Sequence, residues 1–161
     1  MAAVRVLILR APGTNCDEET AYAFSLAGAS PERIHVNRVL ESRDSLATFQ
    51  ILCVPGGFSY GDDLAAGRIL AATLRHQLGD QLASFRDRGG LILGICNGFQ
   101  VLLQTGLLVE PDPKSGRPQA TLAQNDNGRF IDRWVHLAMT AGPCAFVRND
   151  EILHLRCSVI D

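Results

Sequence analysis

Residues 91–100 read LILGICNGFQ and decide the fold class of this chain. The apolar run Leu91–Ile95 predicts a buried strand, and Gly98–Gln104 predicts a helix that follows it directly. A glycine on either side of Ile95-Cys96-Asn97 permits a sharp turn, which would lift the cysteine side chain above the carboxyl end of the sheet. This is a glycine–x–nucleophile–x–glycine elbow with cysteine in place of serine, so Cys96 is the candidate nucleophile.

The chemistry expected of Cys96 follows from this setting. The N-terminus of the following helix favours the thiolate, which is the nucleophilic form of cysteine. The backbone N–H of Asn97 would then be free to stabilise an oxyanion. Free cysteines are often buried and structural, and we favour that interpretation for Cys53, in the middle of a predicted strand. The flanking glycines and the strand–turn–helix setting favour a nucleophile at Cys96.

A second glycine-containing loop, Pro55–Asp63, reads PGGFSYGDD and follows the predicted strand Ile51–Val54. The adjacent glycines Gly56 and Gly57 let the backbone turn freely, so that an amide can point at a ligand. Phosphate binding is the alternative, but the chain has neither a GxxxxGKS/T motif nor GxGxxG after its first strand. Combined with the elbow, this loop predicts the second donor of an oxyanion hole.

The rest of the chain alternates between predicted strands and helices. Such alternation is typical of an α/β domain with a mostly parallel sheet covered on both faces. No internal repeat occurs, and we predict a single domain over residues 1–161. The further strands are expected at Val4–Leu9, Ile34–Val39, Phe130–Met139 and Ile152–Cys157, and the further helices from Asp17 to Gly28, at about Leu64–Leu78, and at Asp80–Arg88 before Gly89-Gly90.

The composition argues against several classes of function. The chain has 161 residues and a formal charge of -2, without the Lys/Arg cluster that nucleic-acid binding needs. Its apolar runs, such as Val6–Leu9, are far shorter than the ~20 residues that span a bilayer, and the N-terminus predicts a strand rather than a signal peptide. The five cysteines include no CxxC pair, which argues against a disulfide framework or a zinc site and favours the cytoplasm.

Taken together, the motifs resemble a known family. Pro55-Gly56-Gly57, the elbow and Gln100 resemble class I, or triad-type, glutamine amidotransferases. FSYGD at 58–62 and CNGFQ at 96–100 are similar to the glutaminase components of phosphoribosylformylglycinamidine synthases, which act in de novo purine synthesis. APGTNCD at 11–17, NGRF at 127–130 and RWV at 133–135 agree with that subgroup. The resemblance runs from about Val4 to Leu155.

The resemblance implies a flavodoxin-like α/β fold and a glutaminase reaction. Cys96 would attack the amide carbon of L-glutamine, forming a γ-glutamyl thioester and releasing ammonia. The backbone amides of Gly57 and Asn97 would form the oxyanion hole, and Gln100 would help to hold glutamine. Ammonia would pass to a synthetase subunit or domain that holds ATP and magnesium, so the resemblance implies no cofactor and no metal in this chain.

The chain departs from the family pattern at Arg156. The family carries the His and Glu of its triad in a downstream Pro-His-Pro-Glu segment, and this chain reads RCSVID at 156–161 instead. We therefore expect an incomplete domain, and we expect the 161-residue chain alone to be no competent glutaminase, since proton transfer needs that pair. We assign no catalytic base among the histidines, which are expected to be surface or strand residues: His35, His76, His136 and His154.

Two other features receive a structural interpretation. Cys16 follows the first strand but lacks the elbow setting, so no catalytic role is predicted for it. The adjacent carboxylates Asp62 and Asp63 are expected in a solvated loop or a helix cap rather than in a metal site.

Three alternatives to the purine-synthesis glutaminase stay open. The first is another class I amidotransferase, against which FSYGD argues. The second is a cysteine hydrolase or chaperone of the related superfamily, which would have a carboxylate beside the elbow cysteine and no glutamine turnover. The third is a catalytically inactive, partner-binding fragment.

Overall fold

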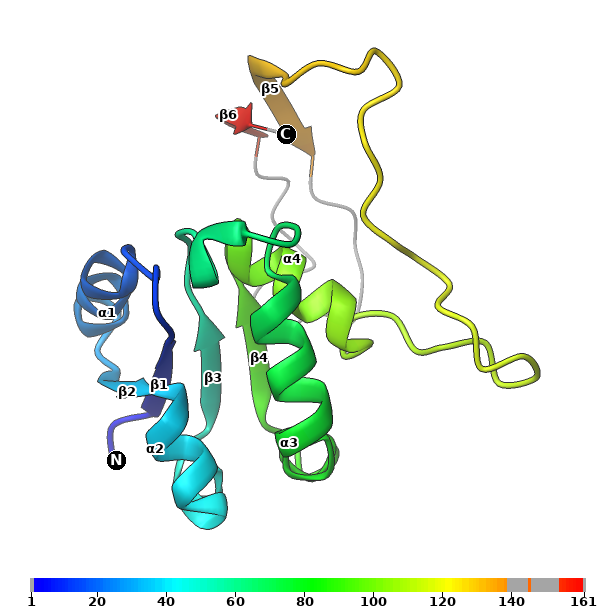
Figure 1. Cartoon of the computed structure of the whole chain (residues 1–161). Helices are drawn as coiled ribbons and strands as arrows, with labels where there is room; N and C mark the ends of the chain where they lie inside the picture. The colour runs from blue at the N-terminus through cyan, green and yellow to red at the C-terminus, as the bar shows by residue number, and fades with distance from the viewer. Residues whose placement is uncertain (1, 139–144, 146–153, 161) are drawn as a thin grey trace. The chain divides into compact units, whose positions relative to one another are not determined.

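The computed structural model describes residues 2–138, 145 and 154–160, which fall into two compact units, Met1–Leu122 and Ala123–Asp161. The first unit contains a four-stranded sheet in the order β2-β1-β3-β4, with every pair parallel (Figure 1). This confirms the predicted α/β class, and the order is that of flavodoxin-like folds. The strands are β1 (Arg5–Arg10), β2 (Ser30–His35), β3 (Ile51–Val54) and β4 (Leu91–Gly94).

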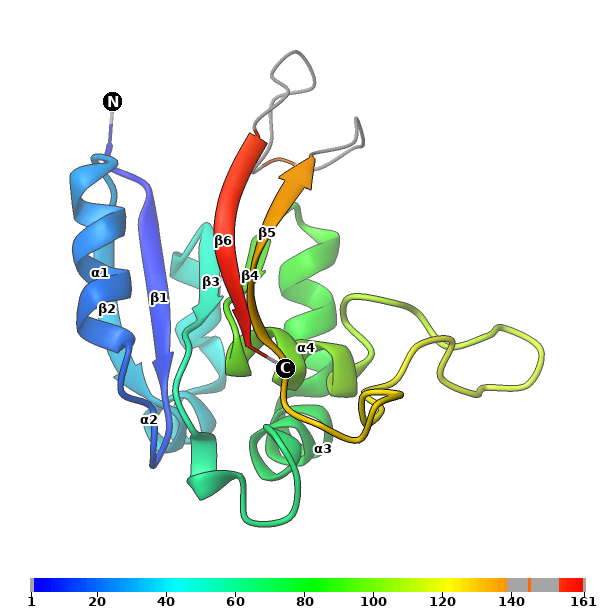
Figure 2. The same ribbon diagram turned by 90° about the horizontal axis from the view of Figure 1, so that it is seen from above.

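Helices pack on both faces of this sheet. In β1, Leu7 and Leu9 face a core shared with α2, α3 and α4, whereas Val6 and Ile8 face the opposite side, toward α1. Figure 1 shows α2 and α3 in front of the sheet, and α1 lies beside β1 in Figure 2. The helices are α1 (Asp17–Leu26), α2 (Val36–Glu41), α3 (Arg68–Asp87) and α4 (Asn97–Thr105), with short 3-10 helices η1 (Arg43–Thr48) and η2 (Ser59–Asp62).

Several predicted elements are confirmed to within one or two residues. The strands around Val4–Leu9 and Ile51–Val54 are β1 and β3, and the strand and helix of the elbow are β4 and α4. Helix α1 begins at Asp17, where three acidic residues suit the positive end of the helix dipole. Gly28 follows its last turn with φ +82°, as expected for a glycine that ends a helix.

The strand predicted at Ile34–Val39 is wrong over most of its length. Strand β2 ends at His35, whose Nδ1 accepts a hydrogen bond from the Asn37 N–H at 3.2 Å and so caps α2. Val36 and Val39 lie three positions apart and are both buried on the core face of that helix. Burial at helical spacing therefore overrides the strand propensity of the two valines.

A single helix, α3, replaces the two helices predicted at about Leu64–Leu78 and Asp80–Arg88. It continues through Gly79, because its buried stripe repeats at helical spacing on both sides of that glycine. Burying the stripe outweighs the roughly 1 kcal/mol that a glycine costs inside a helix. The stripe consists of Leu70, Ala71, Leu74, Leu78, Leu82 and Phe85. Within the part of the chain that the structure describes, no helix is both long and apolar enough to cross a membrane.

The second unit contains an antiparallel strand pair. Strands β5 (Asp132–Ala138) and β6 (His154–Ile160) pair from Asp132 opposite Ile160 to Ala138 opposite His154. They match the strands predicted at Phe130–Met139 and Ile152–Cys157, whose remaining residues after Ala138 and before His154 lie outside the described residues. The single domain over residues 1–161 stays a prediction.

Candidate active site

Cys96 lies at the turn between β4 and α4, at the carboxyl edge of the sheet. It is the N-cap residue of α4, with φ +53° and ψ −113°, and its side chain is exposed. A positive φ is uncommon for a residue with a side chain and costs on the order of 1–3 kcal/mol. The elbow predicted from the sequence is therefore present: a strained turn presents the thiol at the positive end of a helix.

The two flanking glycines are needed because the backbone is closely packed at the elbow. A methyl group on Gly98 would collide with the carbonyl group of Val54 in β3. A methyl group on Gly94 would lie 2.6 Å from Leu102 Cδ1 and 2.7 Å from the Gly98 oxygen. Only glycine allows α4 to approach the ends of β3 and β4 so closely.

The glycine loop after β3 is braced by the loop after β1. Gly57 has φ +132°, and a methyl group there would lie 2.8 Å from the Asn15 nitrogen and 3.0 Å from the Gly13 oxygen. The Phe58 N–H donates to the same Gly13 oxygen at 3.0 Å, and Thr14 forms a bridge with Gly57. The motif at 11–15 thus has a structural role in holding the glycine loop in place.

The glycine loop reaches Cys96, the predicted nucleophile. A methyl group on Gly56 would lie 3.5 Å from Cys96 Cβ. Among the described residues, no hydrogen-bond acceptor is found for the Gly57 N–H. Asn97 is the first residue of α4, where an N–H has no acceptor within its own helix. The structure therefore brings the two predicted donor segments together at Cys96, and their joint binding of an oxyanion stays a prediction.

The side chain of Asn97 connects the elbow to the glycine loop. It is buried, with 3% of its surface exposed. Its Oδ1 accepts from the Ser59 backbone N–H at 3.1 Å and from the Ser59 hydroxyl at 2.7 Å. Its Nδ2 donates to Asp62 Oδ1 and to Gln100 Oε1, both at 3.1 Å. Gln100, the predicted glutamine-binding residue, is thus held one helical turn from Cys96, and its contact with substrate stays a prediction.

No sequence pattern predicts the hydrogen bonds of Ser59 and Asp62 to Asn97. Ser59 is 3% exposed, and no pattern in the sequence signals a buried serine in this loop. Asp62 is only half-buried, but its Oδ1 also accepts the N–H of Gly67, the N-cap residue of α3, at 2.9 Å. Asp62 thus links the glycine loop to the start of a helix, which agrees with the predicted cap more than with a solvated loop.

Cys16 lies closer to the elbow than the sequence indicated. A methyl group on Gly56 would lie 3.6 Å from Cys16 Sγ, on the loop segment that also contacts Cys96. The pKa of the Cys16 thiol is raised by desolvation and then by the negative charges of Glu19, Cys96 and Asp17. Cys16 is therefore a neighbour of Cys96, with a weaker tendency to ionise than an ordinary cysteine.

Two of the four histidines are described with their side chains, and both are structural or surface residues as predicted. His35 caps α2, and His76 is exposed on α3. The side chains of His136 and His154 lie outside the described residues.

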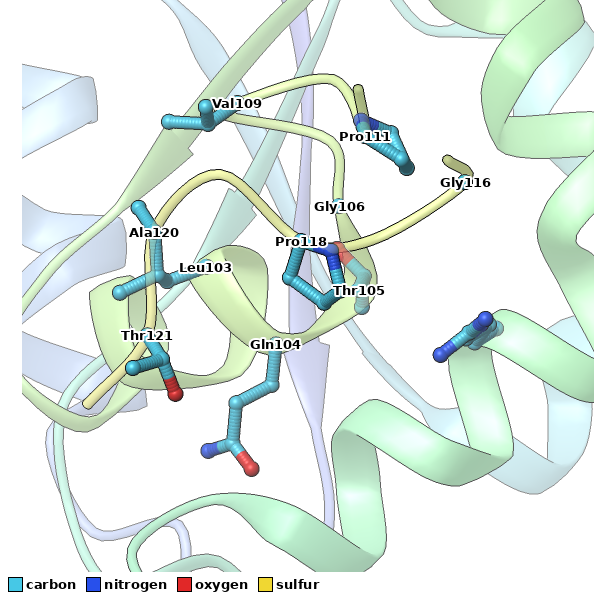
Figure 3. Close-up of a pocket in the computed structure, with 11 residues that line it drawn as sticks. Leu103, Gln104, Thr105, Gly106, Val109, Pro111, Gly116, Pro118, Ala120 and Thr121 are labelled. Atoms are coloured by element: carbon cyan, nitrogen blue, oxygen red, sulfur yellow. The ribbon is translucent and has the colours of Figure 1, made fainter. Parts of the chain in front are cut away.

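A separate cavity of about 300 Å³ lies at the C-terminal end of α4 (Figure 3). It is lined by residues 103–105 of that helix, by its C-cap residue Gly106, by Arg75 of α3, and by part of the segment 109–121. Cys96, Gly57, Asn97 and Gln100 are absent from its described lining, so this cavity is distinct from the elbow.

Comparison with known proteins decides the family. The model of the CobB/CobQ-like glutamine amidotransferase domain matches residues 3–159. The chain belongs to this family. The elbow at Cys96 and the glycine loop at Gly57 are therefore those of a glutamine amidotransferase domain.

Individual relatives of this amidotransferase domain share one name. The phosphoribosylformylglycinamidine synthase subunit PurQ of Dehalococcoides mccartyi is 50% identical over 156 residues, which cover 96% of the chain and 60% of the relative. PurQ of Methanococcus maripaludis is 39% identical over 151 residues, covering 94% of the chain and 56% of the relative. This domain thus spans less than two thirds of the length of these curated relatives.

A solved structure agrees with the sequence relatives. The chain matches a chain in the structure of PurLQS from Thermotoga maritima with a TM-score of 0.77 and 31% identity. The match covers 99% of this amidotransferase domain and 67% of the solved chain. The class I amidotransferase fold expected from the sequence is therefore confirmed.

Proposed function

We propose that this amidotransferase domain belongs to the glutaminase of a phosphoribosylformylglycinamidine synthase, which supplies ammonia for de novo purine synthesis. The observation that carries the proposal is the exposed Cys96 at a strained elbow, in contact with the glycine loop. The name shared by the relatives in Dehalococcoides mccartyi and Methanococcus maripaludis supports this choice over other class I amidotransferases.

The proposed reaction begins with the Cys96 thiolate attacking the side-chain amide carbon of L-glutamine. The carbonyl oxygen becomes an oxyanion, which the Gly57 and Asn97 amides stabilise, and Gln100 orients the substrate. The C–N bond then breaks, ammonia leaves with an added proton, and a γ-glutamyl thioester remains on Cys96. Water hydrolyses the thioester to glutamate and the free thiol. The family resemblance implies that a His–Glu pair carries out proton transfer, and we assign no described residue to that role.

The partner and the compartment are part of the same proposal. A synthetase subunit or domain would receive the ammonia, and ATP and magnesium would bind to that synthetase rather than to this domain. We also propose a cytoplasmic location, because Cys16, Cys53 and Cys96 are free thiols in the described structure, as a reducing compartment would keep them.

The test compares nitrogen sources in the assembled synthase. Two parent chains are compared: this chain, and the same chain extended by the remaining C-terminal residues of the Dehalococcoides mccartyi relative. Each is mixed with the synthetase, ATP, magnesium and formylglycinamide ribonucleotide. Glutamine-dependent product formation should fall by at least about 10³-fold in Cys96→Ala, whereas ammonium-dependent formation should be unchanged. Glutamine-dependent synthesis that survives Cys96→Ala would refute the nucleophile. A complex that forms but uses only ammonium with either parent chain would indicate a partner-binding module instead.

A further inference from the structure

We propose that the Asn97 side chain is a positioning residue, which holds the glycine loop and Gln100 in the geometry that bound glutamine requires. This inference rests on the proposed function and adds to it a role for a side chain that does not touch the reacting atoms. The role is separate from that of the Asn97 backbone amide, the predicted oxyanion donor.

The hydrogen bonds of Asn97 use the full capacity of its amide. The oxygen has two lone pairs and accepts both Ser59 donors, while the nitrogen has two hydrogens and donates to Asp62 and Gln100. The Ser59 backbone N–H can only donate and an ionised Asp62 can only accept, so the orientation of the amide is determined by its partners. Neither an aspartate nor an apolar side chain could serve all four groups.

The Asn97 side chain forms hydrogen bonds with both ends of a strained segment of the loop. Ser59 begins this segment and Asp62 ends it, and Tyr60, Gly61 and Asp62 have φ values of +54°, +68° and +53°. Backbone in this region persists only where its surroundings hold it. Ser59 lies two residues after Gly57. Its two hydrogen bonds to Asn97 therefore also restrain the Gly57 amide, which is predicted to bind the oxyanion.

Burial gives these bonds their strength. Asn97 and Ser59 are each 3% exposed, so water cannot replace a lost partner easily. Removal of the amide would leave the Ser59 N–H without an acceptor, and a buried unsatisfied donor is costly. The loop would relieve that cost by moving, and Gly57 would move with it.

Two reagents separate this role from general structural support. Iodoacetamide alkylates Cys96 in a reaction that needs the thiolate but develops no oxyanion. The chloroketone analogue of glutamine, in which a chloromethyl ketone replaces the side-chain amide, places its ketone oxygen where the oxyanion would form. Its reaction releases chloride and needs no proton donor, so it can be measured in this chain as it stands.

The variants are Asn97→Ala, Ser59→Ala and the control Thr73→Val, which removes a hydroxyl bond to the Ile69 carbonyl within α3. In Asn97→Ala, chloroketone labelling of Cys96 should slow about 10- to 100-fold, while iodoacetamide labelling stays within about threefold of the parent. Ser59→Ala, which loses one bond, should slow chloroketone labelling about 3- to 10-fold. The control should change neither rate.

The inference is overturned if chloroketone labelling is unchanged in Asn97→Ala, or if both reagents slow equally in Asn97→Ala and Ser59→Ala, since the elbow itself would then be lost. Hydrogen–deuterium exchange of residues 57–62 gives a readout that does not depend on glutamine. If L-glutamine fails to protect the parent from the chloroketone, the proposed function fails. Even then, hydrogen–deuterium exchange of residues 57–62 at least about tenfold faster in Asn97→Ala than in the parent would support the anchoring of the loop by Asn97. Unchanged exchange would refute that anchoring.

Discussion

Cys53 lies in β3 and Cys96 lies just after the adjacent strand β4, so the same side chain has very different surroundings at the two positions. Cys53 is fully buried in β3, and burial raises the pKa of its thiol to about 12. Cys96 lies two residues beyond β4, exposed at a helix N-terminus. Position relative to the end of a strand therefore separates a buried thiol that resists ionisation from the predicted nucleophile.

A sub-stoichiometric alkylating agent should consequently label Cys96 first. At pH 8 a thiol of pKa about 12 is ionised in only about one molecule in 10⁴, and the thiolate fraction rises tenfold with each pH unit up to that pKa. Cys53 should therefore stay unlabelled until the protein unfolds, and Cys16, with its raised pKa, should react more slowly than Cys96. Peptide mapping by mass spectrometry gives the order, and faster labelling of Cys53 or Cys16 would contradict the assignment.

The close packing around Gly57 allows its predicted role as an oxyanion donor to be tested by substitution. In Gly57→Ala, the new methyl group would lie 2.8 Å from the Asn15 nitrogen, so the loop must shift and the oxyanion donor with it. In the assembled synthase with the extended chain, glutamine-dependent product formation should therefore fall about 10²–10³-fold, while ammonium-dependent formation stays unchanged.

The matched control for Gly57→Ala is Gly28→Ala. Gly28 also has a positive φ, but no atom lies within 4 Å of a methyl group there. This variant should cost about 1 kcal/mol of stability and leave glutamine use intact. Equal losses of glutamine use in the two variants would show that backbone strain, not the position of the Gly57 amide, explains the effect.

At the scale of elements, α3 shows that a helix is held by its packing rather than by its residues' propensities. Gly79 lies within the helix, and no atom lies within 4 Å of a methyl group there. Gly79→Ala should therefore raise the free energy of unfolding by about 0.5–1 kcal/mol, because alanine loses less backbone entropy than glycine on folding. Urea denaturation measures the change.

The control for Gly79→Ala is Gly90→Ala, just beyond the same helix. A methyl group at Gly90 would collide with the buried side chain of Phe85. That substitution should lower the free energy of unfolding by about 1–3 kcal/mol, which is typical of overpacking. A destabilising Gly79→Ala would mean that the glycine relieves a strain that its open surroundings do not show.

At the scale of the molecule, the buried core described for this chain lies within residues 6–102. The segment between α4 and β5 has no helix or strand, and Lys114 and Arg129 are exposed in it. Trypsin should therefore cut first after Lys114 and Arg129 but not after Arg117, which precedes Pro118. The N-terminal fragment should keep cooperative unfolding and Cys96 labelling, as circular dichroism and mass spectrometry would show. Early cleavage after Arg68 or Arg86 in α3 would contradict this.

Local sequence determined the strands β1, β3 and β4, the elbow and the start of α1. Each depends on neighbours in the chain: an apolar run followed by glycine, or a turn followed by acidic residues. These signals also sufficed to place Cys96 and the glycine loop at the same edge of a parallel sheet. The physical reason is that strand propensity, turn chemistry and helix caps act over a few residues.

Only the tertiary structure decided the features that depend on contacts between distant parts of the chain. The continuity of α3 and the helical state of Val36 and Val39 follow from burial against the sheet. The bonds that join Asn97 to Ser59 and Asp62 span 38 and 35 residues, and local sequence contains no sign of them. They exist because β3 and β4 are adjacent parallel strands whose ends bring the two loops together, and buried polar groups must find partners among whatever the fold places beside them.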